Sequence, residues 1–235
     1  MTDLAIAGVI FDIDGVLVDS PHEPAWRQAL AGFADPTLLT GEIYQAAIAG
    51  RPRLDGARAA LHSLGVADAD LRAPEYAAAK QAILIAMIEA GKFAVYADGL
   101  DFLLAAKRAG FRLAAASSSK NANLMLGRIA LPGGGTLLDA FDANLCGVEV
   151  ANGKPAPDLF LAAAAGLGLS PAQCVVVEDA GVGIRAALAG GMRALGIARH
   201  GDRALLAAAG AELVVSSLAE VAVDRLKAGK LESNC

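Results

Sequence analysis

The sequence predicts an α/β protein with a doubly wound parallel-sheet core, Rossmann-like, and an inserted α-helical domain. Short apolar runs of strand length recur along the chain, and each ends abruptly in polar residues. Ala- and Leu-rich segments of helix length separate most of these runs. This alternation is typical of a parallel sheet with helices on both faces. One long stretch after the first run lacks strand patterns, which indicates an insertion.

The first predicted strand is the apolar run at residues 5–11 (AIAGVIF), which ends at the polar sequence DIDG. Charged and glycine residues cannot continue a buried strand, so a loop follows. The same pattern recurs at 112–118, 174–179, 194–198 and 213–216. The Gly-rich segment 131–136 is a predicted loop before a strand-like FDANLC sequence. Because functional groups in such sheets follow the carboxyl ends of the strands, the sequence predicts that the functional site lies in these loops.

The inserted domain is predicted at residues 21–94. Four successive segments there have helical patterns (PAWRQALAGF, LTGEIYQAAIAG, LDGARAALHSLG and PEYAAAKQAILIAMIEAG). The remaining residues, 1–20 and 95–235, form the predicted core domain. The chain is therefore expected to have two domains, one of them split in sequence.

Composition narrows the class of partner. The 235 residues are 55% hydrophobic and 19% charged, which suits a protein with a large buried core. The net charge of −5 has the wrong sign for binding nucleic acid or an anionic membrane. We expect a small-molecule substrate, no nucleic-acid or membrane partner, and a monomer or weak homodimer.

Cysteine usage and the N-terminus favour a cytoplasmic protein. Cys146, Cys174 and Cys235 are an odd number without metal-binding spacing, so neither a disulfide framework nor a zinc site is expected. The first basic residue is Arg27, so the early apolar run lacks the positive flank of a signal peptide.

The first chemical candidates are Asp12 and Asp14 in DIDGVLVDS. Two carboxylates at positions i and i+2 of an extended segment point to the same side. Their charges repel unless a cation lies between them or one carboxyl keeps a proton. The pair therefore indicates a divalent-ion site, an acid/base role or both.

The other predicted strand ends also carry polar groups. Ser117 begins SSSKN, whose hydroxyls precede a helix and suit an oxyanion. Lys154 stands in GKPAPD before another helix, where its charge can neutralise a phosphoryl group. Glu178 and Asp179 follow the run VVV and suit a metal ion. The order of these groups along the chain is carboxylate pair, serine, lysine and acidic pair.

A rival motif follows the acidic pair. Gly181 and Gly183 form a GxGxxA pattern that imitates a dinucleotide-binding turn. Its opening residues, Glu178 and Asp179, would repel a pyrophosphate, and it comes late in the chain. We assign the glycines to a tight turn and close helix packing.

The four ordered motifs resemble those of the haloacid dehalogenase superfamily of phosphotransferases. The resemblance covers essentially the whole chain and implies that the inserted helices are an α-helical cap. It also implies that Asp12 is a nucleophile that forms an aspartyl-phosphate and that Asp14 is the general acid and later the base. Ser117 and Lys154 are implied to bind the transferring phosphoryl group. Mg²⁺ is the implied cofactor, with these metal residues: Asp12, Asp14, Glu178 and Asp179.

Finer features resemble the β-phosphoglucomutase branch. The sequence SSSKNA matches its phosphate-binding motif, which implies phosphate contacts for Ser119, Lys120 and Asn121. In the cap, GRPRLDG resembles the branch's specificity loop, which implies that Arg53 clamps a non-reacting phosphate through its two-pronged guanidinium. The resemblance also places Lys80 and His22 among the substrate-facing cap residues.

Two departures from that branch leave the net reaction open. Ala49 stands where a lysine often precedes the hinge glycine, and the stretch between Asp19 and Trp26 is short. The expected function is Mg²⁺-dependent phosphoryl transfer from a small phosphorylated metabolite of the sugar-phosphate class, as in β-phosphoglucomutase. The alternative is a sugar-phosphate phosphatase without mutase activity. A non-catalytic binding module is disfavoured because every carboxylate is retained.

Overall fold

The computed structural model describes residues 5–234, so Cys235 and the first four residues of the predicted core domain lie outside the described residues. The chain divides into two compact units. One, called here the core unit, contains the residues up to Asp19 and those from Val95 onward. The other, the helical unit, is Ser20–Ala94.

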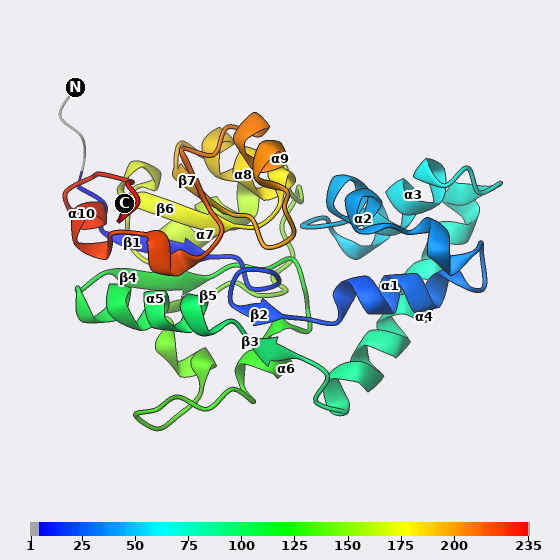
Figure 1. The fold of residues 1–235 in the computed structure, drawn as a ribbon, viewed down its shortest axis with the longest axis horizontal. Helices are drawn as coiled ribbons and strands as arrows, with labels where there is room; N and C mark the ends of the chain where they lie inside the picture. The colour runs from blue at the N-terminus through cyan, green and yellow to red at the C-terminus, as the bar shows by residue number, and fades with distance from the viewer. Residues whose placement is uncertain (1–4, 235) are drawn as a thin grey trace. The chain divides into compact units, whose positions relative to one another are not determined.

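A six-stranded sheet forms the centre of the core unit, and all of its strands are parallel (Figure 1). Its spatial order is β5-β4-β1-β6-β7-β8. The strands are β1 (Gly8–Phe11), β4 (Arg112–Ala115), β5 (Ala143–Asn144), β6 (Cys174–Glu178), β7 (Arg193–Ile197) and β8 (Leu213–Val215). The predicted doubly wound α/β class is confirmed.

The register of the sheet brings three polar strand ends together. Phe11, the last residue of β1, pairs with Ala115 of β4 on one side and with Val177 of β6 on the other. Asp12 N–H then donates to the Val177 carbonyl at 3.0 Å. Because the three strands are neighbours and parallel, the loops that follow them lie at the same edge of the sheet.

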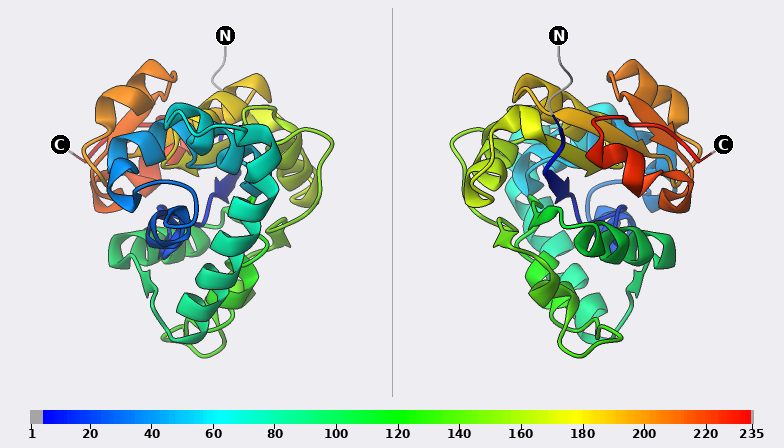
Figure 2. Two further views of the ribbon diagram at one scale, coloured as in Figure 1. Left: turned by 90° about the vertical axis from the view of Figure 1, so that its right-hand side faces the viewer. Right: turned by 90° about the vertical axis from the view of Figure 1, so that its left-hand side faces the viewer.

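Helices cover both faces of this sheet. Figure 2 shows α7 and α8 on the side of β1 opposite α5 and α10. The helices are α5 (Ala97–Arg108), α6 (Ala122–Leu126), α7 (Asp158–Gly166), α8 (Gly181–Ala189), α9 (Arg203–Ala208) and α10 (Val223–Lys227). Short 3-10 helices occur at Leu137–Ala140, Pro171–Gln173 and Leu218–Glu220.

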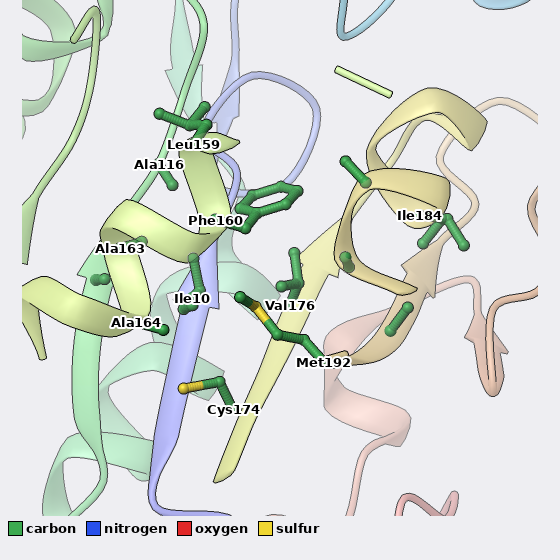
Figure 3. Packing of buried hydrophobic residues seen from close by; sticks show 14 of the residues in the cluster. Ile10, Ala116, Leu159, Phe160, Ala163, Ala164, Cys174, Val176, Ile184 and Met192 are labelled. Atoms are coloured by element: carbon green, nitrogen blue, oxygen red, sulfur yellow. The ribbon is translucent and has the colours of Figure 1, made fainter. Parts of the chain in front are cut away.

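The apolar residues of α7, α8 and the sheet make a tightly packed core (Figure 3). Phe160 and Leu159 of α7 pack with Ile10 of β1 and Val176 of β6, and Ile184 of α8 joins the same cluster. Small alanine side chains on α7 let this helix lie close to the strands. The carboxyl ends of β1 and β6 are thereby held on a rigid support.

The helical unit has a hydrophobic core of its own. Its helices are α1 (His22–Leu30), α2 (Gly41–Ala47), α3 (Arg53–Ser63) and α4 (Ala69–Glu89), with a 3-10 helix at Pro36–Leu38. Tyr76 of α4 is fully buried and donates its hydroxyl proton to the Trp26 carbonyl at 2.9 Å. The two aromatic rings also pack together, with centroids 4.9 Å apart.

A second, two-stranded sheet joins β2 (Val18–Asp19) and β3 (Ala94–Val95). These strands lie where the chain passes from one unit to the other and back. Each strand is only two residues long, so the sequence shows no alternating pattern from which it could be predicted.

Two further expectations concern membranes and cysteines. Within residues 5–234, no helix has the length and apolar character needed to cross a bilayer. Cys146 and Cys174 are both buried, and each has a free thiol.

Candidate active site

A buried lysine joins two carboxylates at the sheet edge. Lys154 lies in the loop before α7, and its Nζ is 2.6 Å from Asp12 Oδ1 and 2.6 Å from Glu178 Oε1. The lysine and glutamate side chains have no exposed area, and that of Asp12 is 8% exposed. Charges taken out of water in this way must be paired to be tolerated. The structure thus brings together three of the residues expected from the sequence.

Burial also governs the protonation of this cluster. It raises the pKa of Asp12 to about 7, and the charges of Glu178 and Asp14 add to the rise while Lys154 opposes it. Burial and Glu178 likewise raise the pKa of Asp179 well above its ordinary value. Burial opposes the charge of Lys154, but Asp12 and Glu178 outweigh it and raise its pKa, so the lysine is a cation.

Glu178 is held on both sides. Its Oε1 accepts from Lys154, and its Oε2 accepts from the Ala180 N–H at 2.6 Å. A Cβ on Gly183 would lie 1.7 Å from Oε1, so only glycine permits this approach of α8. The carboxylate of Glu178 therefore occupies the turn of the GxGxxA pattern. This contact agrees with the assignment of its glycines to close helix packing.

The second aspartate, Asp14, lies on the turn after Asp12. Ser117, which follows β4, donates its hydroxyl proton to Asp14 Oδ2 at 3.2 Å. Gly15 has a φ of +81°, and a Cβ there would lie 2.0 Å from Asp179 Oδ2. The turn thus needs glycine for its backbone conformation and for its closeness to Asp179.

Three carboxylates are close enough to bind one metal ion. Single oxygens of Asp12, Glu178 and Asp179 lie within 4.8 Å of one another. Carboxylate oxygens are the ligands that hard divalent cations prefer. Burial raises the pKa values of Asp12 and Asp179, and the neighbouring carboxylates add to the rise, so a bound cation would favour the ionised form of both side chains. The donor set therefore fits a divalent cation.

The serine-rich loop after β4 has two parts. Ser117 is buried, and its Oγ accepts from the Ser119 N–H at 3.1 Å. Ser119 Oγ in turn accepts from the N–H of Asn121, the residue that precedes α6. Lys120 instead forms an exposed ion pair with Glu149, with its Nζ 2.6 Å from Glu149 Oε1. Ser117 of this loop contacts the aspartate turn through its hydrogen bond to Asp14.

Within the helical unit, two of the expected residues form a pair. Lys80 of α4 is 3% exposed, its Nζ lies 3.2 Å from His22 Nδ1, and it lies over the Trp26 ring. Arg53 is exposed and begins α3, which has Pro52 before it.

Sequence reasoning missed Arg199, which follows β7. Its Nε lies 3.3 Å from the Gly15 carbonyl and its Nη2 lies 3.1 Å from the Val16 carbonyl, both on the aspartate turn. A single arginine after a strand carries no local signal. Only the arrangement of β7 next to β6 indicates that it lies near the site.

The family is decided by comparison with known proteins. The family model described as haloacid dehalogenase-like hydrolase matches residues 6–191. The chain belongs to this family. The resemblance expected from the ordered motifs is therefore confirmed, and the protein is an enzyme of the phosphotransferase and phosphatase type.

Relatives of the chain include both mutases and phosphatases. Fructose-1-phosphate phosphatase YqaB of Escherichia coli is 34% identical, over 81% of this chain and 96% of its own length. Beta-phosphoglucomutase of Mycobacterium bovis is 32% identical, over 92% and 91%. The solved beta-phosphoglucomutase of Pyrococcus sp. strain ST 04 has a TM-score of 0.74 at 35% identity, covering 94% of this chain and 97% of its own. The chain thus lies in the β-phosphoglucomutase-like branch.

Proposed function

We propose that this protein catalyses Mg²⁺-dependent phosphoryl transfer from a small sugar phosphate through an aspartyl-phosphate on Asp12. The observation that carries the proposal is the buried contact of Lys154 with Asp12 and Glu178. It places a permanent cation beside a carboxylate at the end of the central strand. The relatives named for sugar phosphates support the substrate class.

Asp12 would be the nucleophile. One of its oxygens attacks phosphorus while the bond from phosphorus to the sugar oxygen breaks, which divides a difficult displacement into two easier steps. Lys154 would offset negative charge on the phosphoryl oxygens as the bond forms. Ser117 supplies a hydroxyl at the same strand edge.

Asp14 would move the proton. In the first step it gives a proton to the leaving sugar oxygen, and in the second it takes one from water or from the acceptor hydroxyl. The hydrogen bond from Ser117 to Asp14 Oδ2 would hold this carboxyl in the turn that follows Asp12.

Mg²⁺ would be held by Asp12 and Asp179, with the main-chain carbonyl of Asp14. When bound, it supplies charge that neutralises the phosphate oxygens. Glu178 belongs to the same cluster, but both of its oxygens already accept hydrogen bonds. Its role would be to hold Lys154 and the turn before α8.

The helical unit would act as a cap that selects the substrate. His22 and Lys80 would contact the sugar, and Arg53 would bind a remote phosphate. Ser119 and Asn121 of the core unit would complete the phosphate site.

Net hydrolysis is the second candidate, and a specific substitution favours it. Ala49 stands where the mutase branch often has lysine, so one cation that would retain a bisphosphate intermediate is missing. The relative named as a fructose-1-phosphate phosphatase supports this alternative.

The test is a screen of sugar monophosphates with Mg²⁺, with and without a sugar bisphosphate, that measures free phosphate and isomerised product. Phosphoryl transfer predicts turnover that chelation by EDTA abolishes and that Mg²⁺ restores. Isomerisation that requires the bisphosphate identifies a mutase, whereas phosphate release without it identifies a phosphatase.

Asp12→Asn is the control variant for this screen. We expect it to lower kcat by on the order of 10⁴-fold or more, since the nucleophile is lost, while the circular dichroism spectrum stays unchanged. Phosphate release at the wild-type rate in that variant would overturn the aspartyl-phosphate mechanism.

A further inference from the structure

Arg199 joins the aspartate turn to helix α5. Besides its contacts with the carbonyls of Gly15 and Val16, its Nη1 lies 2.8 Å from Asp98 Oδ2 in the first turn of α5. The planar guanidinium is suited to this task because its donors point in several directions from one rigid group. One side chain therefore connects two successive peptide groups of the turn with a charged partner in a helix.

The end of the turn is held through Tyr96. The guanidinium carbon of Arg199 lies 4.0 Å from the centre of the Tyr96 ring. The Tyr96 N–H donates to the Leu17 carbonyl at 2.9 Å, and its hydroxyl bonds the side chain of Asp19. Arg199 and Tyr96 together thus contact the segment from Gly15 to Asp19 along its length.

Asp98 anchors this arrangement to the body of the core unit. Its Oδ2 accepts from Ser217 Oγ and from the Leu218 N–H, both at 2.8 Å. Burial opposes ionisation of Asp98, but these bonds and Arg199 outweigh it and lower its pKa. The side chains of Arg199 and Asp98 are 10% and 18% exposed, so water screens the pair less than it screens a surface ion pair.

The turn has little room to move. A Cβ on Gly99 would lie 2.8 Å from the Val16 carbonyl, which shows how closely α5 approaches it. On the other side Gly15 lies directly against the Asp179 carboxylate. A displacement of the turn would therefore shift the Asp14 backbone and disturb Asp179 at the same time.

We propose that Arg199 is a positioning residue, which holds the turn carrying Asp14 through the carbonyls of Gly15 and Val16. This inference rests on the proposed role of Asp14 in proton transfer. Positioning acts on the reacting geometry, and a misplacement of about 1 Å can cost about 10²-fold in rate. Arg199 should therefore affect kcat far more than KM.

Arg193 provides a matched control. It lies at the other end of β7, and it too contacts a carboxylate, Glu212, and a backbone carbonyl, that of Gly229. Replacing Arg193 removes a comparable set of contacts far along the strand from the aspartate turn. A merely structural role for Arg199 predicts the same result for both arginines.

The kinetic experiment compares Arg199→Met, Arg199→Lys and Arg193→Met with para-nitrophenyl phosphate and Mg²⁺. We expect Arg199→Met to lower kcat by about 10²-fold with KM nearly unchanged. Arg199→Lys should recover part of the rate, because an ammonium cannot hold two carbonyls and a carboxylate in one plane. Arg193→Met should keep the wild-type kcat.

Hydrogen exchange of the backbone amides tests the inference without relying on activity. The Leu17 and Val18 amides bond the Ile13 carbonyl within the turn, so they should exchange faster in Arg199→Met than in the wild type or Arg193→Met. If the wild-type protein is inactive on all phosphate esters, the proposed function is contradicted. In that case the hydrogen-exchange data alone decide whether Arg199 holds the turn.

Two outcomes would overturn the role of Arg199. One is unchanged exchange at Leu17 and Val18, and the other is a kcat loss shared equally by Arg199→Met and Arg193→Met. Should Arg199→Met fail to fold, Arg199→Lys is measured instead, and a wild-type kcat with wild-type exchange in that variant contradicts the inference.

Discussion

The two units of the chain hold their charged side chains in different ways. In the core unit, Asp12, Lys154 and Glu178 are buried in mutual contact at one edge of the sheet. In the helical unit, Lys80 is buried beside an aromatic ring and a histidine, while Arg53 is exposed at a helix start. Interlocked buried charges cannot be replaced singly without leaving an uncompensated partner, whereas an exposed arginine can. With the roles proposed for the two units, this difference would let substrate contacts vary while the buried chemistry of the core unit stays constant.

Replacing Lys154 should have the largest effect on stability. We expect Lys154→Met to lower the free energy of unfolding by about 3–5 kcal/mol, because it leaves Asp12 and Glu178 buried without their cation. The exposed Arg53→Ala should change it by less than about 0.5 kcal/mol. Urea unfolding of both variants without Mg²⁺ measures the difference. Similar losses in the two would show that the units do not differ in this respect.

Arg53 should instead affect substrate selection. Arg53→Ala should cost about 2–4 kcal/mol in kcat/KM for a sugar bisphosphate, because the charged partner of the remote phosphate is lost. A monophosphate should lose much less, and Arg53→Lys should restore only part of the bisphosphate rate. Steady-state kinetics of both variants on both substrates give the answer. Equal losses on the two substrates would mean that Arg53 only supports the helical unit.

The last expected effect is a pH dependence of stability that Mg²⁺ removes. Folding raises the pKa of Asp12 from 3.8 to about 7, and it raises the pKa of Asp179 as well. Between these pH values the folded protein therefore binds more protons than the unfolded chain. Without metal, the free energy of unfolding should therefore fall as the pH rises from about 4 to about 7.

Mg²⁺ competes with these protons and should stabilise the protein more at pH 8 than at pH 5. At a free concentration one hundred times Kd the gain is about 2.7 kcal/mol. Thermal unfolding across this range, with and without Mg²⁺, measures both effects. Asp179→Asn, which removes one of the titrating carboxylates, should flatten the curve. A stability that rises with pH in the metal-free protein would contradict the assignment.

What the sequence predicted depended on local signals. Abrupt changes from apolar to charged residues marked the ends of β1 and β6, so Asp12 and Glu178 could be identified as strand-end groups. The predicted strand at residues 5–11 is longer than the observed Gly8–Phe11, because the apolar run includes Ile6, which is buried before the strand begins. Hydrophobic pattern reports burial, and burial is not limited to paired residues.

Contacts between distant residues could not be predicted in the same way. Lys154 and Asp12 are separated by 142 positions, and their hydrogen bond depends on the strand order of the sheet. The motifs indicated a lysine near phosphate, but gave no sign that Glu178 holds it from the other side. Arg199 had no motif at all, since its partners are backbone carbonyls, which every residue type provides.

The pairing of β2 with β3 affects how the chain folds and how far the inserted segment can vary in evolution. The residues that leave the core unit and those that return to it are neighbours in one small sheet. Asp14 and Ser117 are 103 positions apart in the sequence, and their contact closes a loop of that length. Once β2 pairs with β3, the inserted residues no longer count toward this loop. The loop is then much shorter, and its closure costs less conformational entropy. Insertions whose ends meet at such a point are tolerated in length and sequence. A lineage can therefore lengthen, shorten or replace the inserted helices while the strands of the parallel sheet keep their register.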